Sequence, residues 1–198
     1  MHTQGWIVVA VLVGLVGWFG RAALSEAETG EDAGGQDMAK VMEELAKPGE
    51  MHAWLARCNG AWDVTGEFSE EDGSKTAVEG TARFRMILGD RFSQQDLSIR
   101  MGEKPYEGIG ITGYDNLKKQ FTSYWFDSWS TYTSPGVGQR SAEGRTLTLT
   151  GAWDMPGSQV PFKYVYTWAD DDHFTFRMFM TWEGQEAEVG TLQYSRKE

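Results

Sequence analysis

The sequence predicts an all-β protein: an antiparallel meander β-barrel of about nine or ten strands, with one or two short N-terminal helices. From Trp62 onward, apolar and polar side chains alternate in long runs, which is typical of strands with one buried face. Short turn signals separate these runs, so consecutive strands should pair as hairpins. No stretch between them is long enough for a crossover helix, and closure into a barrel would remove the exposed edges.

The alternating runs predict the side chains that face the barrel interior. They are Trp62, Val64 and Phe68; Ala82, Phe84, Met86 and Leu88; Phe162, Tyr164, Tyr166 and Trp168; and Phe174, Phe176, Met178, Met180 and Trp182. The turn signals between strands are Glu71-Asp72-Gly73, Gly89-Asp90, Asp115-Asn116, Glu143-Gly144, Asp170-Asp171-Asp172 and Glu183-Gly184.

Residues 105–129 are predicted to form a hairpin whose glycines and aromatic residues indicate how its two strands pack. In its first strand, Ile109 and Ile111 alternate with glycines, and glycine within a strand indicates a bend, a bulge or a close approach of another group. Its second strand, predicted to run from Lys119 to Trp129, carries aromatic residues on both faces. An exposed Tyr124-Phe126 pair would offer a surface to a protein partner.

The N-terminal part is predicted to have three sections. Residues 1–25 resemble a signal peptide, because the uncharged run 6–20 is shorter than the roughly 20 residues of a membrane span. The first five residues contain no Lys or Arg, so a retained anchor formed by residues 6–20 is the alternative. Residues 26–36 read as a flexible acidic linker. The folded domain is expected at 37–198, beginning with helices at Met38–Ala46 and about Gly49–Arg57.

Composition limits the partners and the location of the protein. The net charge of −11 argues against binding to nucleic acid, and any membrane contact is expected only through an uncleaved N-terminal segment. From the predicted leader we expect an exported protein, periplasmic or extracellular, or one anchored in the membrane by residues 6–20. Cys58 is the single cysteine, so no intramolecular disulfide can form. We expect Cys58 to be a small buried residue, with a reactive thiol or an intermolecular disulfide as the alternative.

Trp62 and Arg196 are predicted to close the barrel. Gly60-Ala61-Trp62 follows a short helix and opens the first strand, and Arg196 ends the last strand. Because the first and last strands of a closed meander are neighbours, the Arg196 guanidinium should lie over the Trp62 ring. This arrangement resembles the Gly-x-Trp and terminal Arg pair of lipocalins.

A longer series of motifs resembles one bacterial family of unknown function, family 1579. The motifs are Gly60-Ala61-Trp62, Leu88-Gly89-Asp90-Arg91-Phe92, Tyr106-Glu107-Gly108, Gly113-Tyr114-Asp115-Asn116, Trp125-Phe126-Asp127-Ser128, Leu147-Thr148-Leu149-Thr150-Gly151 and Tyr194-Ser195-Arg196-Lys197. The resemblance covers residues 48–197 and departs from the family at Asp90 and Trp129. It implies a lipocalin-like barrel and no established reaction.

No pattern of catalytic or metal-ligating residues stands out, so we expect no enzyme, no metal and no cofactor. His52, His173 and Cys58 lack the spacing of a zinc site. An axial haem ligand at His173 is a minor alternative. Asp170-Asp171-Asp172 is expected to be a solvated turn, with calcium binding as its alternative.

The barrel interior is the remaining candidate site. The leading hypothesis is non-enzymatic binding of a small hydrophobic molecule, with apolar burial from aromatic and Met side chains and orientation by polar ones. The candidate residues are Trp125, Asp127, Tyr164, Tyr166, Trp168, Phe176 and Met178. For Asp127, the alternative is a structural role, as a hydrogen-bond partner of a nearby backbone amide or Arg. The alternative is a structural or interaction protein of the cell envelope with a filled barrel and no ligand.

Overall fold

The computed structural model describes residues 32–70 and 72–198, so the predicted leader at 1–25 lies outside the described residues. Two helices and a short 3-10 helix precede ten strands. They are α1 (Asp32–Ala46), α2 (Glu50–Leu55), η1 (Ala56–Cys58), β1 (Gly60–Ser69), β2 (Lys75–Ile87), β3 (Phe92–Met101), β4 (Lys104–Asp115), β5 (Gln120–Asp127), β6 (Ser134–Arg140), β7 (Thr146–Met155), β8 (Ser158–Trp168), β9 (His173–Trp182) and β10 (Gln185–Arg196).

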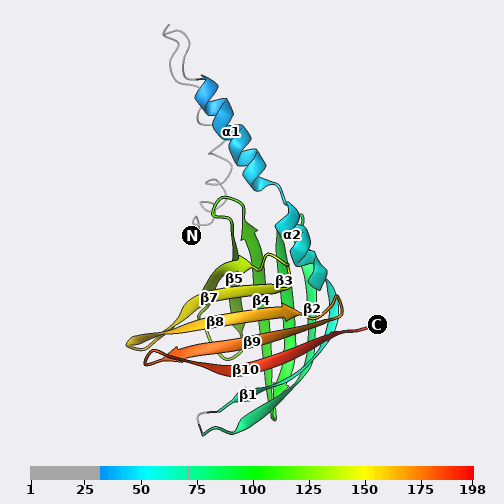
Figure 1. The fold of residues 1–198 in the computed structure, drawn as a ribbon, viewed down its shortest axis with the longest axis vertical. Helices are drawn as coiled ribbons and strands as arrows, with labels where there is room; N and C mark the ends of the chain where they lie inside the picture. Colours follow the sequence, from blue (N-terminus) through cyan, green and yellow to red (C-terminus); the bar gives the residue numbers. More distant parts are fainter. Residues whose placement is uncertain (1–31, 71) are drawn as a thin grey trace, which may run out of the picture. The chain divides into compact units, whose positions relative to one another are not determined.

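The ten strands form a closed antiparallel barrel in sequence order, as the sequence predicted (Figure 1). Each strand pairs with its neighbours in the chain, and β1 closes the ring by pairing with both β2 and β10. In this closure Trp62 lies directly opposite Arg196. Every strand in the described part of the chain therefore has two partners, and the barrel they form leaves no sheet edge to recruit another chain.

Helix α1 begins earlier than predicted, at Asp32, so residues 32–36 of the predicted linker are helical. The linker prediction relied on the absence of large apolar side chains, which shows only that a segment buries little. A helix that buries little has the same composition. No helix within 32–198 combines the length and the apolar character that a membrane crossing needs.

The barrel has two different ends. At the helix end, α2 and η1 contact the strand connections: Trp54 Nε1 donates to Gly144 O at 3.0 Å, and Arg57 pairs with Asp171 at 3.1 Å. Because consecutive hairpins of a meander turn at opposite ends, the β1–β2, β3–β4, β5–β6, β7–β8 and β9–β10 connections lie at the other end. We call this second end the mouth.

The interior at the helix end is filled by aromatic side chains. Trp62 is fully buried and meets Phe174 edge to face, with 4.9 Å between ring centroids. Phe174 stacks on Tyr194 at 4.2 Å. Cys58 is buried here, as predicted, and burial raises the pKa of its thiol to about 12. The thiol is therefore protonated at neutral pH, which argues against the reactive alternative.

Arg196 seals this end as the sequence predicted. Its guanidinium carbon lies 4.2 Å from the centroid of the Trp62 ring. The same group donates to the backbone oxygens of Asn59 at 2.6 Å, and of Arg57 and Asp171 at 2.8 Å. Arg196 thus joins the start of β1, the end of β10 and the β8–β9 connection, while its contribution to stability stays a prediction.

The β8–β9 connection is a turn held by ion pairs. Asp170 accepts a hydrogen bond from the Asp172 amide and pairs with His173, whereas Asp171 and Asp172 pair with Arg57 and Arg196. The three carboxylates therefore serve different partners and do not converge on one point. This geometry fits the predicted turn and not the calcium alternative.

Three side chains depart from the predicted faces. Leu88 and Trp182 were assigned to the interior but are 70% and 49% exposed. Strand β2 ends at Ile87, and Leu88 starts a turn with φ 54°, while Trp182 ends β9 at the mouth. Strand β5 stops at Asp127, so Trp129 lies in the β5–β6 connection. The alternating pattern does not reveal where a strand ends.

Candidate ligand-binding site

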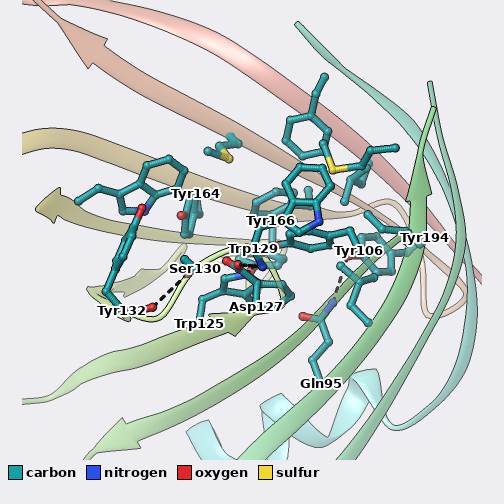
Figure 2. A pocket seen from close by; sticks show the side chains of 18 residues that line it. Gln95, Tyr106, Trp125, Asp127, Trp129, Ser130, Tyr132, Tyr164, Tyr166 and Tyr194 are labelled. Carbon is teal, nitrogen blue, oxygen red and sulfur yellow. Dashed lines mark hydrogen bonds between the residues drawn. The ribbon is translucent and has the colours of Figure 1, made fainter. Parts of the chain in front are cut away.

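A cavity of about 340 Å³ occupies the mouth half of the barrel (Figure 2). Its inner part is bounded by buried residues such as Leu97 and Leu192. Its outer part is bounded by Trp129 and Tyr132 of the β5–β6 connection, which are 53% and 48% exposed. The cavity thus runs from the packed core toward solvent, and its volume is within the range of small-molecule sites.

Aromatic side chains dominate the lining. Ten of the eighteen lining residues carry an aromatic ring, and two are methionines. The complete lining is Phe68, Gln95, Leu97, Ile99, Met101, Tyr106, Trp125, Asp127, Trp129, Ser130, Tyr132, Trp153, Tyr164, Tyr166, Phe176, Met178, Leu192 and Tyr194. Such a wall favours apolar ligands and offers only a few polar groups to orient them.

Trp125 owes its position to two glycines of β4. A Cβ atom at Gly108 would lie 2.1 Å from Trp125 Cζ2, and one at Gly110 would lie 3.2 Å from the same indole. The ring therefore lies flat against bare backbone, which confirms the close approach predicted from these glycines. Trp125 Nε1 also donates to Tyr106 Oη at 2.8 Å, and the two rings are nearly parallel.

The β5–β6 connection at the mouth is held by local hydrogen bonds. Asp127 Oδ1 accepts from the Trp129 amide at 2.9 Å, and Trp129 Nε1 donates to Pro105 O at 3.1 Å. Thr133 Oγ1 donates to Trp125 O at 2.8 Å. These bonds fix the outer wall of the cavity without a ligand, so binding would need little ordering of this segment.

The polar groups of the lining are mostly neutral. At the inner end, Gln95 Nε2 donates to Tyr194 Oη at 3.1 Å, and both side chains are buried. Burial raises the pKa of Tyr106, Tyr164, Tyr166 and Tyr194, so these hydroxyls remain protonated at neutral pH. Each can donate or accept one hydrogen bond to orient a ligand.

The structure brings together six of the seven predicted site residues. Trp125, Asp127, Tyr164, Tyr166, Phe176 and Met178 all line the cavity. Trp168 does not, because β8 runs the length of the barrel and ends with Trp168 at the helix end. There it packs edge to face on Trp54 at 4.9 Å and borders a separate cavity of about 40 Å³.

The sequence reasoning missed several lining residues. Trp153 shares a face of β7 with Leu147 and Leu149, so alternation could have found it. Gln95 shares a face of β3 with Leu97 in the same way. Tyr132 lies in a connection, where no periodic pattern exists to place it.

Neither described histidine contacts this cavity. His52 is buried in α2, where its Nδ1 accepts from the Gly49 amide at 3.0 Å. His173 begins β9 at the helix end and pairs with Asp170, so it is not positioned as an axial ligand for a group bound in the cavity. Across residues 32–198, position 71 aside, no cluster of His, Cys, Asp or Glu could hold a metal ion.

Comparison with known proteins finds one family that matches the chain and solved structures that share its barrel fold. A family described as "Protein of unknown function (DUF1579)" matches residues 47–196. No curated protein matches the chain.

Solved structures of similar fold include the following two. Rv2717c from M. tuberculosis is 15% identical with a TM-score of 0.58, and the match covers 77% of this chain and 100% of that one. The S-type phycobiliprotein lyase CPES from Guillardia theta is 11% identical with a TM-score of 0.51, covering 75% and 93%. At these identities the likeness extends to the barrel fold alone.

Proposed function

This chain belongs to the DUF1579 family of proteins of unknown function, and we propose that it is a non-enzymatic carrier that holds one small hydrophobic molecule inside its barrel. The observation that carries the proposal is the division of the interior. The helix end is packed with aromatic side chains, and the mouth half encloses about 340 Å³ of mostly apolar space.

The mouth half of the barrel is not filled by side chains, which supports a use for the space. A barrel that only had to be stable could fill this volume with larger side chains. Gly108 and Gly110 instead leave room for the Trp125 ring to lie against the wall, so the ring does not fill the cavity.

The lining favours binding over catalysis. Asp127 is its one charged residue, and no His, Lys or Cys stands near it in the lining to complete an acid–base or nucleophilic pair. A barrel of similar fold is named a phycobiliprotein lyase, so a reaction in the cavity is the competing proposal. Within the lining, that proposal would have to rely on Asp127 and the nearby tyrosine hydroxyls, such as that of Tyr106.

A second candidate function is protein binding on the outer face of β4 and β5. Ile109 lies opposite Phe126, and these side chains and Tyr124 are 44–46% exposed. Three exposed apolar residues on adjacent strands favour contact with another protein. This surface and the cavity use opposite faces of the same strands, so substitutions can separate the two functions.

The carrier proposal is tested by titrating the protein with N-phenyl-1-naphthylamine, a neutral apolar dye, and following its fluorescence. Met178→Trp replaces the thioether side chain with a larger indole ring in the cavity and is expected to weaken dye binding at least 10-fold. Met155→Trp is the matched control, because Met155 is 44% exposed and is not part of the lining. If the native protein does not bind the dye, or if both variants bind it equally well, the cavity is not the binding site.

A further inference from the structure

The cavity lining carries one charge, and that charge is negative. Asp127 is the only Asp, Glu, Lys, Arg or His among the eighteen lining residues. It forms no ion pair with any Lys, Arg or His in the described part of the chain. A carboxylate that faces an apolar cavity without a cationic partner favours a ligand that supplies the positive charge.

Aromatic rings gather around this carboxylate. Figure 2 shows Asp127 beside Trp125 and Trp129. Trp125 precedes it by two residues on the same face of β5, and Trp129 donates its amide to Oδ1. The Tyr106 ring completes the group, with its centroid 5.1 Å from that of Trp129. Asp127 also helps to raise the pKa of Tyr106, as expected for a nearby negative charge.

Ring faces carry negative partial charge and attract cations. Each favourable contact of an ammonium group with a Trp or Tyr face stabilises the complex by about 0.5–2 kcal/mol. Aromatic cages recognise quaternary ammonium groups in this way. Three rings and one carboxylate at the cavity wall provide both interactions, whereas the carboxylate of a fatty acid would meet repulsion there.

The charge around the mouth has the same sign. The strand connections at this end carry Glu70, Asp72, Glu103 and Glu183, and their described residues include no Lys, Arg or His. Three basic residues flank these connections. Lys75 is paired with Glu67, and Arg100 donates to Glu103 O, whereas Lys104 at the start of β4 is exposed. Connections at the helix end, in contrast, contain basic residues, which are Arg91, Lys118, Lys119 and Arg145.

The whole chain reinforces this local pattern. Its net charge of −11 attracts cations over long range and repels anions. The acidic mouth therefore favours the approach of a positively charged ligand, and the cavity wall behind it favours retention.

We infer that the molecule carried is a cationic amphiphile, with an amine or quaternary ammonium group on an apolar body. The inference rests on the proposed carrier function and names its ligand class. The cationic group lies at Asp127 among the rings of Tyr106, Trp125 and Trp129. The apolar body extends inward toward Leu97 and Leu192, where no charged side chain lines the cavity.

The test compares three probes with the same chain and different head groups: decyltrimethylammonium, decanol and decanoate, below their micelle concentrations. Binding is followed by calorimetry at low ionic strength. We expect decyltrimethylammonium to bind at least 10-fold more tightly than decanol, and decanoate to bind most weakly. This ranking uses the native protein and needs no variant.

Asp127→Asn then isolates the charge. The amide oxygen can still accept from the Trp129 amide, so the loop should keep its conformation. We expect this variant to lose about 10-fold in affinity for decyltrimethylammonium and to bind decanol within 2-fold of the native protein. Asp154→Asn is the matched control, because Asp154 hydrogen-bonds Gln159 and does not line the cavity.

The outcomes separate the two proposals. Equal binding of the three probes, or tighter binding of decanoate, would overturn the ligand class and leave the carrier function standing. The same holds if Asp127→Asn and the native protein bind the cation equally. If none of the probes binds and the neutral dye is also ignored, the carrier function itself fails.

Discussion

Replacement of Trp62 by alanine is expected to lower the free energy of unfolding by about 3–5 kcal/mol, the usual cost of removing a large buried aromatic side chain. Trp62 is fully buried and packs edge to face against Phe84 and Phe174. Its Nε1 donates to Cys58 O at 2.8 Å. Truncation would open a cavity at the barrel closure, leave that carbonyl unpaired and remove the ring beneath Arg196.

Guanidinium denaturation followed by circular dichroism measures this effect. Trp182→Ala is the matched control, because Trp182 is 49% exposed at the end of β9 and should change the unfolding free energy by less than about 0.5 kcal/mol. Trp62 does not line the ligand cavity, so Trp62→Ala should still bind the neutral dye while it is folded. An unchanged denaturation midpoint would show that the Trp62–Arg196 closure does not stabilise the barrel.

Gly108→Ala is expected to disturb the cavity more than any other single-methyl change on β4. The new Cβ would lie 2.1 Å from the Trp125 indole, so the ring must leave the wall and move into the cavity. Overpacking of this kind destabilises proteins by about 1–3 kcal/mol. Because Trp125 would then occupy ligand space, we expect dye affinity to fall at least 10-fold.

Gly110→Ala provides a graded comparison on the same strand. Its Cβ would lie 3.2 Å from the same indole, a contact that a shift of a few tenths of an ångström relieves. Stability and dye affinity should therefore fall less than in Gly108→Ala. Equal effects of the two substitutions, or none, would contradict the role assigned to the glycines in holding Trp125 back.

The barrel could be predicted from the sequence because its determinants are local. Each strand shows in its own residues which face is buried, and each short turn forces its two strands to pair. Closure then makes the first and last strands neighbours, which is why Trp62 and Arg196 could be paired across 134 positions of sequence. The prediction of about nine or ten strands follows from these rules without any knowledge of the interior.

The division of the interior could not be predicted in the same way. Alternation shows that Tyr164 and Trp168 share a face, but not how far along the barrel each one lies. That height depends on strand register, as in the pairing of Leu149 with Tyr164 and of Phe174 with Trp168. The two side chains therefore contribute to different regions, one to the cavity and one to the packed core.

Residues outside the strands were the hardest to place. Tyr132 lies in the β5–β6 connection, where local hydrogen bonds and not periodicity determine its position. The glycines of β4 did indicate a close approach, but their partner Trp125 became known only from the β4–β5 register, in which it lies opposite Gly110. Local sequence therefore identifies a contact more readily than it identifies both partners.

Native mass spectrometry of the protein purified from its own host tests the central claim most directly, with extraction and identification of any bound molecule. The carrier proposal predicts one apolar molecule per chain, lost in Met178→Trp and retained in Met155→Trp. A protein that emerges empty, and that also fails to bind the neutral dye and the three decyl probes, would contradict it. The search for function would then move to the exposed apolar face of β4 and β5.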